Sequence, residues 1–360
     1  MAEPMKNQLN IELLKPIVTF IKQANSNFDA EKFIALVFDD HWKNLELKQR
    51  YRKISESFKK TLPNDYATAV ELLGKASQAF TGFETLFFPD FIEAYGWQQK
   101  QHFDVSMKAI ETMTASSSAE FAIRPFIKKY PLQTFQQLQQ WAVSDNEHLR
   151  RLASEGTRPK LPWASQLKEL AQDPTPNILI LELLKKDPSK YVQKSVANHL
   201  NDISKDHPER VLKICSKWQG SSPQTNWIIK HACRTLLKQA HPQALRLFGY
   251  SNADDIKVTE FTLEPQVIIG GKLHFSFKLS SPHLFGKTRI EYAIHFMKSN
   301  GKTNKKIFKI SEADYPVNEK EISKNYSFKN ITTRKYYLGK HQLEVIINGQ
   351  SKACRDFLLI

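Results

Sequence analysis

The spacing of apolar residues changes once along this chain, near residue 250. Before that point apolar residues recur three and four positions apart, as at Leu14, Ile17 and Ile21, which is the period of one helix face. After it apolar and polar residues alternate, which is typical of strands with one buried face. A chain of 360 residues can form two separate cores. The sequence therefore predicts a helical domain over residues 1–250 and a strand domain over residues 254–360.

A weak repeat is present in the helical half. Three segments combine apolar residues with a cation, and a fourth precedes them; they are 149–153, 192–197, 228–232 and 123–127. Each is followed by a turn and a second apolar helix, as at residues 208–214. Helix pairs of this kind are typical of HEAT-like repeats, whose period is about 40–47 residues, although the spacing here is irregular. The pattern predicts an α-helical solenoid whose inner helices line one concave surface.

The second half contains five alternating segments separated by glycine-containing turns. The segments are 258–263, 273–279, 290–296, 306–310 and 342–347, and the turns include Gly270-Gly271 and Asn348-Gly349. Strands at this spacing over about a hundred residues predict an immunoglobulin-like antiparallel β-sandwich. Because no Cys…Trp…Cys pattern is present, "immunoglobulin-like" describes the architecture only.

Charge and cysteine content limit the class of protein. Lys and Arg number 52 against 37 Asp and Glu, a net charge of +15, which favours an anionic partner such as nucleic acid; a generally basic soluble protein is the alternative. The three cysteines lack zinc-site spacing, and they indicate a reduced cytoplasmic compartment. Neither a signal peptide nor a membrane-spanning apolar run is recognisable. We expect a cytoplasmic monomer without a metal or cofactor.

The stretch from Arg150 to Trp163 has the most unusual composition. Four cations, the carboxylate Glu155 and the indole of Trp163 lie within fourteen residues. This mixture is not needed in a core, but it suits a site that binds a polyanion and a cationic aromatic group. Cations on the repeat helices would extend it into a basic stripe that contacts phosphates without reading sequence. The predicted DNA-binding residues are Arg150, Arg151, Arg158, Lys160, Lys194, Lys230 and Arg234.

The same stretch closely resembles the signature of the AlkC alkylpurine DNA glycosylases, which are related to AlkD. Residues 118–126 and 195–202 are similar to two further motifs of that family and occur in the same order. The resemblance covers about residues 1–250, and the strand domain resembles the immunoglobulin-like extension of one branch. Lys160 stands where the family pattern has arginine, and lysine loses the bidentate phosphate geometry.

The resemblance implies an activity and a set of site residues. Members of the family remove 3-methyladenine and 3-methylcytosine from duplex DNA without extruding the lesion into a protein pocket. Glu120, Glu155, Trp163 and Asp202 match the family's catalytic residues, and the implied partner is double-stranded DNA with alkylated bases. An N3-methylated base is cationic, and loss of the base gives the sugar oxocarbenium character. Carboxylates stabilise such a transition state, and an indole face attracts the cation.

Each of these residues also has a purely structural explanation. Ser117 and Glu120 have capping-box spacing, Asp202 could cap a turn or pair with Lys205, and Trp163 could anchor a core. Glu155 near a helix end opposes the helix dipole, so its structural explanation is the weakest. For the whole chain, the alternative is a non-catalytic HEAT-repeat scaffold that binds DNA or an acidic protein.

The strand domain carries its own basic run. Its lysines are Lys302, Lys305, Lys306 and Lys309. A solvated surface explains such a run, and a contact with the same DNA as the solenoid is the functional alternative. We expect the strand domain to contact DNA and to help the solenoid surround it.

Overall fold

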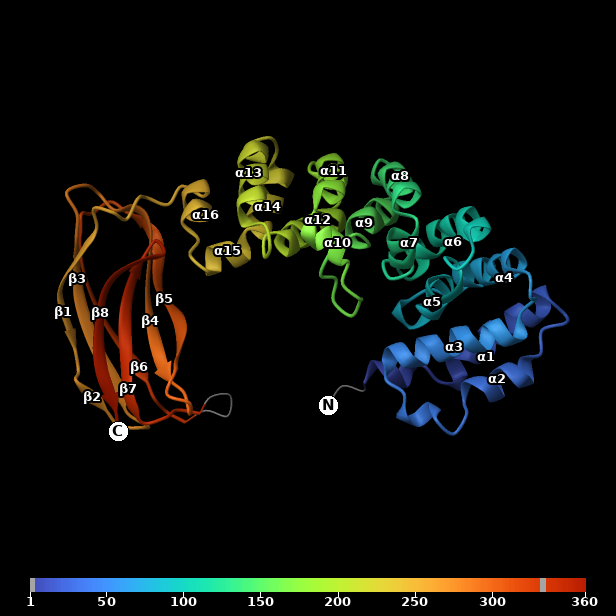
Figure 1. Ribbon diagram of the computed structural model, residues 1–360, viewed down its shortest axis with the longest axis horizontal. Coiled ribbons are helices and arrows are strands. Elements are labelled where there is room, and N and C mark those ends of the chain that lie inside the picture. The colour runs from blue at the N-terminus through green and yellow to red at the C-terminus, as the bar shows by residue number, and fades with distance from the viewer. Residues whose placement is uncertain (1–3, 331–334) are drawn as a thin grey trace. The chain divides into compact units, whose positions relative to one another are not determined.

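The computed structural model describes residues 4–330 and 335–360 (Figure 1). Residues 1–3, the beginning of the segment in which no signal peptide was recognised, lie outside the described residues. The chain divides into two compact units, residues 1–232 and 233–360. No helix in the described part of the chain is long and apolar enough to cross a membrane.

The described part of the first unit contains helices and no strands, as the spacing of its apolar residues predicts. In α1, for example, Leu14, Ile17, Val18 and Ile21 are all buried and follow the three- and four-residue spacing. Short 3₁₀ turns lie between some of the helices. The helices are α1 (Ile11–Ala24), α2 (Ala30–Val37), α3 (Leu47–Thr61), α4 (Tyr66–Ala79), α5 (Phe87–Tyr95), α6 (Phe103–Ser116), α7 (Arg124–Lys129), α8 (Pro131–Ala142), α9 (Glu147–Glu155), α10 (Lys168–Gln172), α11 (Thr175–Leu184), α12 (Lys190–Ile203), α13 (Pro208–Trp218) and α14 (Pro223–Ala232).

These helices stack as two layers along the unit (Figure 1). The three segments with the apolar-cation pattern lie in α9, α12 and α14, and α12 packs against both of the others. Helices α8, α11 and α13 form the second layer, and α8 packs on both α9 and α11. The predicted HEAT-like solenoid is therefore confirmed, with the fourth segment forming the short helix α7.

The second unit is a β-sandwich with two short helices at its start. Its elements are α15 (Arg234–Lys238), α16 (Pro242–Leu247), β1 (Lys257–Leu263), β2 (Gln266–Val267), β3 (Lys272–Ser280), β4 (Gly286–Met297), β5 (Thr303–Tyr315), β6 (Glu319–Ser327), β7 (Gly339–Ile347) and β8 (Gln350–Leu359). One sheet has the strand order β1-β3-β6 and the other β2-β8-β7-β4-β5. The immunoglobulin-like sandwich is confirmed, and the five expected segments form β1, β3, β4, β5 and β7. Among the described strands, only β2 and β8 pair in parallel.

Helices α15 and α16 pack with the sandwich, although the expected limits of 1–250 and 254–360 place them with the solenoid. Arg289 Nη1 donates to the carbonyl of Leu237 at 2.8 Å, and Lys287 Nζ donates to that of Phe248 at 2.6 Å. The β7–β8 turn also lies against this segment. A Cβ on Gly349, whose φ is +80°, would lie 2.0 Å from the carbonyl oxygen of Ala240, so only glycine fits there.

Candidate functional site

Three predicted site carboxylates come from three different parts of the solenoid and join one chain of ion pairs. Glu120 lies in the turn between α6 and α7, Glu155 is the last residue of α9, and Asp202 lies in the last turn of α12. Arg151 Nη1 is 3.0 Å from Glu120 Oε2, and its Nη2 is 3.7 Å from Glu155 Oε1. Arg158 Nη1 is 2.6 Å from the same Glu155 oxygen, and its Nε is 2.8 Å from Asp202 Oδ2. The packing of α9 against both α6 and α12 brings these groups together.

The three carboxylates of this ion-pair chain are largely shielded from solvent. The exposed fraction of the side chain is 13% for Glu120, 9% for Glu155 and 4% for Asp202. A buried carboxylate is tolerated when a guanidinium pairs with it, because the pair replaces part of the lost hydration. Three carboxylates face two guanidiniums here, so the centre stays anionic unless Lys205, which lies 3.0 Å from Asp202 Oδ1, is included.

The carboxylates in turn keep the two arginines charged. Burial lowers the pKa of Arg151, but the charges of Glu120 and Glu155 outweigh burial, and the pKa is raised above its ordinary value. The pKa of Arg158 is likewise lowered by burial and raised more strongly by Glu155 and Asp202, so that it also ends above its ordinary value. Both guanidiniums therefore stay charged in spite of their burial.

Two hydroxyl groups fix the orientation of the carboxylates. Ser195 Oγ donates to Glu155 Oε2 at 2.6 Å, and Ser118 Oγ contacts both Glu120 and Arg151 Nη1. The capping box considered for Ser117 and Glu120 is wrong, because no helix begins there and α7 begins only at Arg124. The carboxylate of Glu120 pairs with Arg151 instead. The pair between Asp202 and Lys205 does form, alongside the pair with Arg158.

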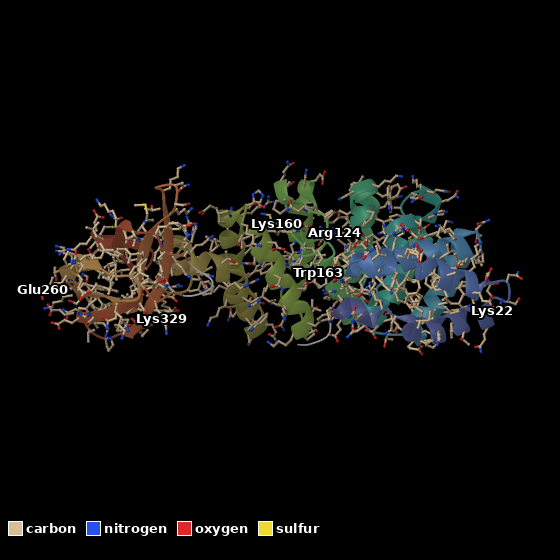
Figure 2. The ribbon with its side chains drawn as sticks, turned by 90° about the horizontal axis from the view of Figure 1, so that it is seen from below. Lys22, Arg124, Lys160, Trp163, Glu260 and Lys329 are labelled. Carbon is tan, nitrogen blue, oxygen red and sulfur yellow. The ribbon has the colours of Figure 1, made fainter. Side chains whose placement is uncertain are left out.

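Trp163 lies at the surface of the segment between α9 and α10. Its side chain is 63% exposed, so the alternative of a core anchor is wrong, and the neighbouring Leu161 is the buried residue. The φ angle of Trp163 is +64°, the left-handed region that non-glycine residues rarely adopt. Its ring meets Phe83 edge to face at 6.2 Å, and its carbonyl accepts from Lys48 Nζ at 3.0 Å. Figure 2 labels Trp163, Arg124 and Lys160 in the middle of the helical unit.

A small pocket connects the exposed indole to the ion-pair chain. Trp163 and Ser118 line it together with Lys48, Phe121 and Glu93. Lys48 Nζ lies 4.4 Å from the centre of the Phe121 ring. Burial and the neighbouring Asp90 raise the pKa of Glu93 above its ordinary value. Trp163 and the Ser118 end of the ion-pair chain therefore border the same hollow.

The seven predicted DNA-binding cations lie in different environments. Arg150 bonds Asp187 through Nε at 2.7 Å and Nη2 at 3.2 Å, and its Nη1 donates to the carbonyls of Ser144 and Asp145. A guanidinium has five N–H donors, so four of those of Arg150 already have protein acceptors. Lys160 Nζ lies 2.7 Å from Asp206. Arg151 and Arg158 belong to the ion-pair chain.

The remaining three cations are exposed. Lys194 on α12 and Lys230 on α14 have no acidic partner within residues 4–330 and 335–360. Arg234 begins α15 and belongs to the second unit. Lys194 and Lys230 are therefore the predicted cations whose charge is fully available to a phosphate, and the roles of all seven stay predictions.

Several residues of the site were not singled out from the sequence. Tyr191, 44% exposed, lies with its ring 5.2 Å from the Arg151 guanidinium, and Ser195 bonds Glu155. Arg124, a member of the second motif, is buried beneath the Trp163 segment. Motif membership was a signal for Ser195 and Arg124, whereas nothing local marks Tyr191. Among the described residues, no three His, Cys, Asp or Glu side chains group as metal ligands would.

Fold and site together define a helical-repeat protein with a carboxylate–arginine centre beside an exposed indole. A family model described as "DNA alkylation repair enzyme" matches residues 42–236, and the chain therefore belongs to that family. A second model, "Uncharacterised protein YhaZ, C-terminal Ig-like domain", matches residues 257–360. The resemblance drawn from the three motifs and the strand domain is thereby confirmed.

Two relatives match over nearly their whole length. The uncharacterized protein YhaZ of Bacillus subtilis (strain 168) is 44% identical over 355 residues, which cover 98% of each chain. The structure of the Pseudomonas fluorescens alkylpurine DNA glycosylase AlkC, bound to DNA containing an abasic site analog, is 36% identical. It covers 100% of this chain and 99% of its own, with a TM-score of 0.83.

Proposed function

We propose that this protein is a monofunctional DNA glycosylase. It hydrolyses the N-glycosidic bond of cationic N3-methylated bases, 3-methyladenine and 3-methylcytosine, in duplex DNA and leaves an abasic site. It acts as a cytoplasmic monomer, without a metal or cofactor and without flipping the base. The observation that carries the proposal is the group of three carboxylates, Glu120, Glu155 and Asp202, beside an exposed indole. The protein also aligns over its full length with an alkylpurine DNA glycosylase.

Electrostatic stabilisation is the chemical basis of the proposal. Cleavage of the bond leaves positive character on the deoxyribose while the base departs neutral. Fixed carboxylates stabilise that sugar cation, and they need not reorganise during the reaction because Arg151, Arg158 and two serines already hold them. Glu120 is the most accessible of the three carboxylates, so we assign to it the contact with the deoxyribose and the attacking water.

The exposed cations and the indole explain how damaged DNA would be held. Lys194 and Lys230 contact phosphates, which positions the duplex without selecting a sequence. The indole of Trp163 offers a face to the cationic lesion or to the sugar that carries it. Recognition then depends on the charge and lability of the lesion, and no protein pocket has to receive a flipped base.

The strand domain adds a second contact with DNA in this proposal. Lys302 is exposed on the β4–β5 turn, and Lys306 follows on β5. Changing both to Gln removes the charge and leaves the fold intact, because neither forms an ion pair within the described residues. The double variant should bind duplex DNA with lower affinity. Unchanged affinity would show that these two lysines do not contribute to DNA binding.

Base release from methylated duplex DNA tests the proposal directly. The purified protein should release 3-methyladenine, and Glu155→Gln should slow the single-turnover rate by about 10²–10³-fold, as loss of one transition-state stabiliser does elsewhere. Glu147→Gln is a matched control, since Glu147 lies on the same helix α9 and outside the ion-pair chain. No release by protein that still binds DNA would refute the glycosylase assignment.

A non-catalytic scaffold for DNA or an acidic protein remains the alternative function. The two arginines that neutralise part of the acidic centre would suit a purely structural network. Salt-dependent DNA binding is expected of both functions, because phosphate contacts alone produce it. Turnover is the measurement that separates them.

A further inference from the structure

The segment from Gly156 to Gln166, between α9 and α10, carries both Arg158 and Trp163. It has no helix or strand to satisfy its backbone carbonyls, and buried carbonyls need donors from elsewhere. Asn177 Nδ2 donates to the carbonyl of Thr157 at 3.2 Å, and Lys48 donates to that of Trp163. Backbone N–H groups of Ala164 and Leu167 donate to the carbonyls of Leu161 and Pro159, both at 3.2 Å. Three further carbonyls accept from one side chain of another helix.

That side chain is Arg124, the first residue of α7. Its Nη1 donates to the carbonyls of Gly156 and Arg158, both at 2.9 Å, and its Nη2 donates to the carbonyl of Ser165 at 2.7 Å. Arg124 is only 3% exposed, so the guanidinium lies beneath the segment rather than on it. The guanidinium is planar and its N–H groups point in fixed directions. Because it bonds both ends of the segment, it restricts the distance between the two ends.

Two neighbouring contacts support the same arrangement. A Cβ on Gly156 would lie 2.5 Å from Ile123 Cγ2, so the absence of a side chain lets the segment approach the residue just before Arg124. Lys128, one turn further along α7, donates to Ser165 Oγ at 3.1 Å. The first turn of α7 and the segment therefore pack as one piece.

The segment needs such a clamp because Trp163 is strained. A left-handed conformation at a non-glycine residue is unfavourable, and it persists only where the surroundings impose it. The indole itself is exposed and contributes little burial to hold the backbone. The donors beneath the segment hold the backbone that carries the indole and Arg158, while Glu155 and Asp202 bind the Arg158 guanidinium itself.

We propose that Arg124 is a positioning residue for the glycosylase reaction, which clamps both ends of residues 156–165 and thereby holds Trp163 and Arg158 in their working positions. The inference rests on the proposed function for its link to catalysis. Arg124 itself touches neither DNA nor the departing base, since it is buried under the segment. Its effect on the reaction is indirect, through the placement of the indole and of the arginine that holds Glu155 and Asp202.

Arg124→Lys tests the clamp, because lysine keeps the charge and cannot reach three carbonyls at both ends of the segment. The single-turnover rate of base release should fall about 10–100-fold, as misplacement of reacting groups by an ångström does. Affinity for duplex DNA with an abasic-site analogue should stay within about threefold, because no phosphate contact is lost. In a Trp163→Ala background the same substitution should lose most of its effect, since contacting or coupled residues are non-additive.

Arg50→Lys is the matched control. Arg50 is also a buried arginine, and it also donates to backbone carbonyls, those of Leu45 and Lys6, but these lie outside the Trp163 segment. Equal rate losses in Arg50→Lys and Arg124→Lys would indicate a general loss of stability and overturn the proposal.

A readout independent of activity is the ¹⁹F spectrum of fluorotryptophan-labelled protein, in which the Trp163 signal is assigned with Trp163→Phe. Arg124→Lys should shift or broaden that signal, and Arg50→Lys should leave it unchanged. If Arg124→Lys does not fold, Gly156→Ala replaces it, because the added methyl group displaces the same end of the segment. An unmoved Trp163 signal in the folded variant overturns the clamp. If the wild-type protein releases no base, the proposed function is wrong. The ¹⁹F spectrum then still shows whether Arg124 holds the Trp163 segment in place.

Discussion

Arg158 Nε lies 2.8 Å from Asp202 Oδ2, although the two residues are 44 positions apart in the sequence. The same guanidinium bonds Glu155, so a single side chain neutralises carboxylates from α9 and α12. Both carboxylates are less than one tenth exposed, so the guanidinium joins α9 to α12 and also neutralises part of the buried negative charge.

Removing this guanidinium should destabilise the helical unit. Arg158→Met leaves Glu155 and Asp202 buried with part of their compensation gone, so the free energy of unfolding should fall by about 3–5 kcal/mol. Arg210→Met, which breaks the exposed pair with Asp173, should cost about 0.2–1 kcal/mol. Urea titrations followed by far-UV circular dichroism, which reports on the helical unit, measure both. Equal losses of unfolding free energy in the two variants would show that burial does not make the Arg158 bridge more important for stability than an exposed ion pair.

The strain at Trp163 gives a prediction with an unusual sign. Trp163→Gly should be more stable to unfolding than Trp163→Ala by about 1 kcal/mol, because glycine adopts the left-handed conformation without the Cβ penalty. Both variants should lose base release to a similar extent, since both lack the indole. Urea unfolding and single-turnover assays on the pair separate the two effects. An alanine variant as stable as the glycine variant would mean that the backbone relaxes at this position.

Where apolar residues set the structure, the sequence predicted the fold well. In β3 the buried positions alternate along the strand, and alternation of the same residues predicted it. Strand β6 was missed because only Ile322 and Tyr326 of its nine residues are buried, so the alternation is too sparse to recognise. Backbone pairing with β3 along its whole length defines β6 instead, and a single sequence contains no record of that pairing.

The candidate site was less predictable than the fold. The resemblance supplied Glu120, Glu155 and Asp202, but the pairing of Arg151 with Glu120 and of Arg158 with Asp202 depends on how α9 stacks on its neighbours. Local sequence also left a core role open for Trp163, whose side chain is exposed and whose backbone angle no flanking residue dictates. Four of the predicted phosphate ligands, Arg150, Arg151, Arg158 and Lys160, also pair with carboxylates, and local sequence does not reveal this pairing.

The different environments of the cations predict different salt effects on DNA binding. Lys194→Gln and Lys230→Gln should each weaken binding to any duplex and lower the slope of log K against log salt by about 1, because each removes one phosphate contact. Lys213→Gln on α13, in the other helix layer, should leave the slope unchanged. Affinity measured across a salt series with one duplex of undamaged DNA tests this. Equal slopes in all three variants would place the DNA away from α12 and α14.

His199 should make the stability of the helical unit sensitive to mild acid. Burial and, to a smaller extent, the charge of Arg158 together lower the pKa of its imidazole to about 3. Neither ring nitrogen is hydrogen-bonded within the described part of the chain, although the carbonyl of Ser154 lies nearby. Below the ordinary histidine pKa the imidazole is protonated in the unfolded chain but not in the folded chain. The contribution of His199 to the free energy of unfolding is therefore fully present above about pH 6.5 and is lost as the pH is lowered toward 3.

The expected slope is about 1.4 kcal/mol per pH unit within that window, or about 2 kcal/mol between pH 6.5 and pH 5. His199→Phe removes the titrating group and should flatten this part of the stability curve even if the larger ring lowers stability at every pH. His283→Gln, at an exposed position of the strand unit, should leave the slope as it is in the wild type. Urea unfolding of the helical unit at a series of pH values supplies the three curves. A His199→Phe curve as steep as that of the wild type would assign the acid sensitivity to other groups, because the buried imidazole would then make no measurable contribution.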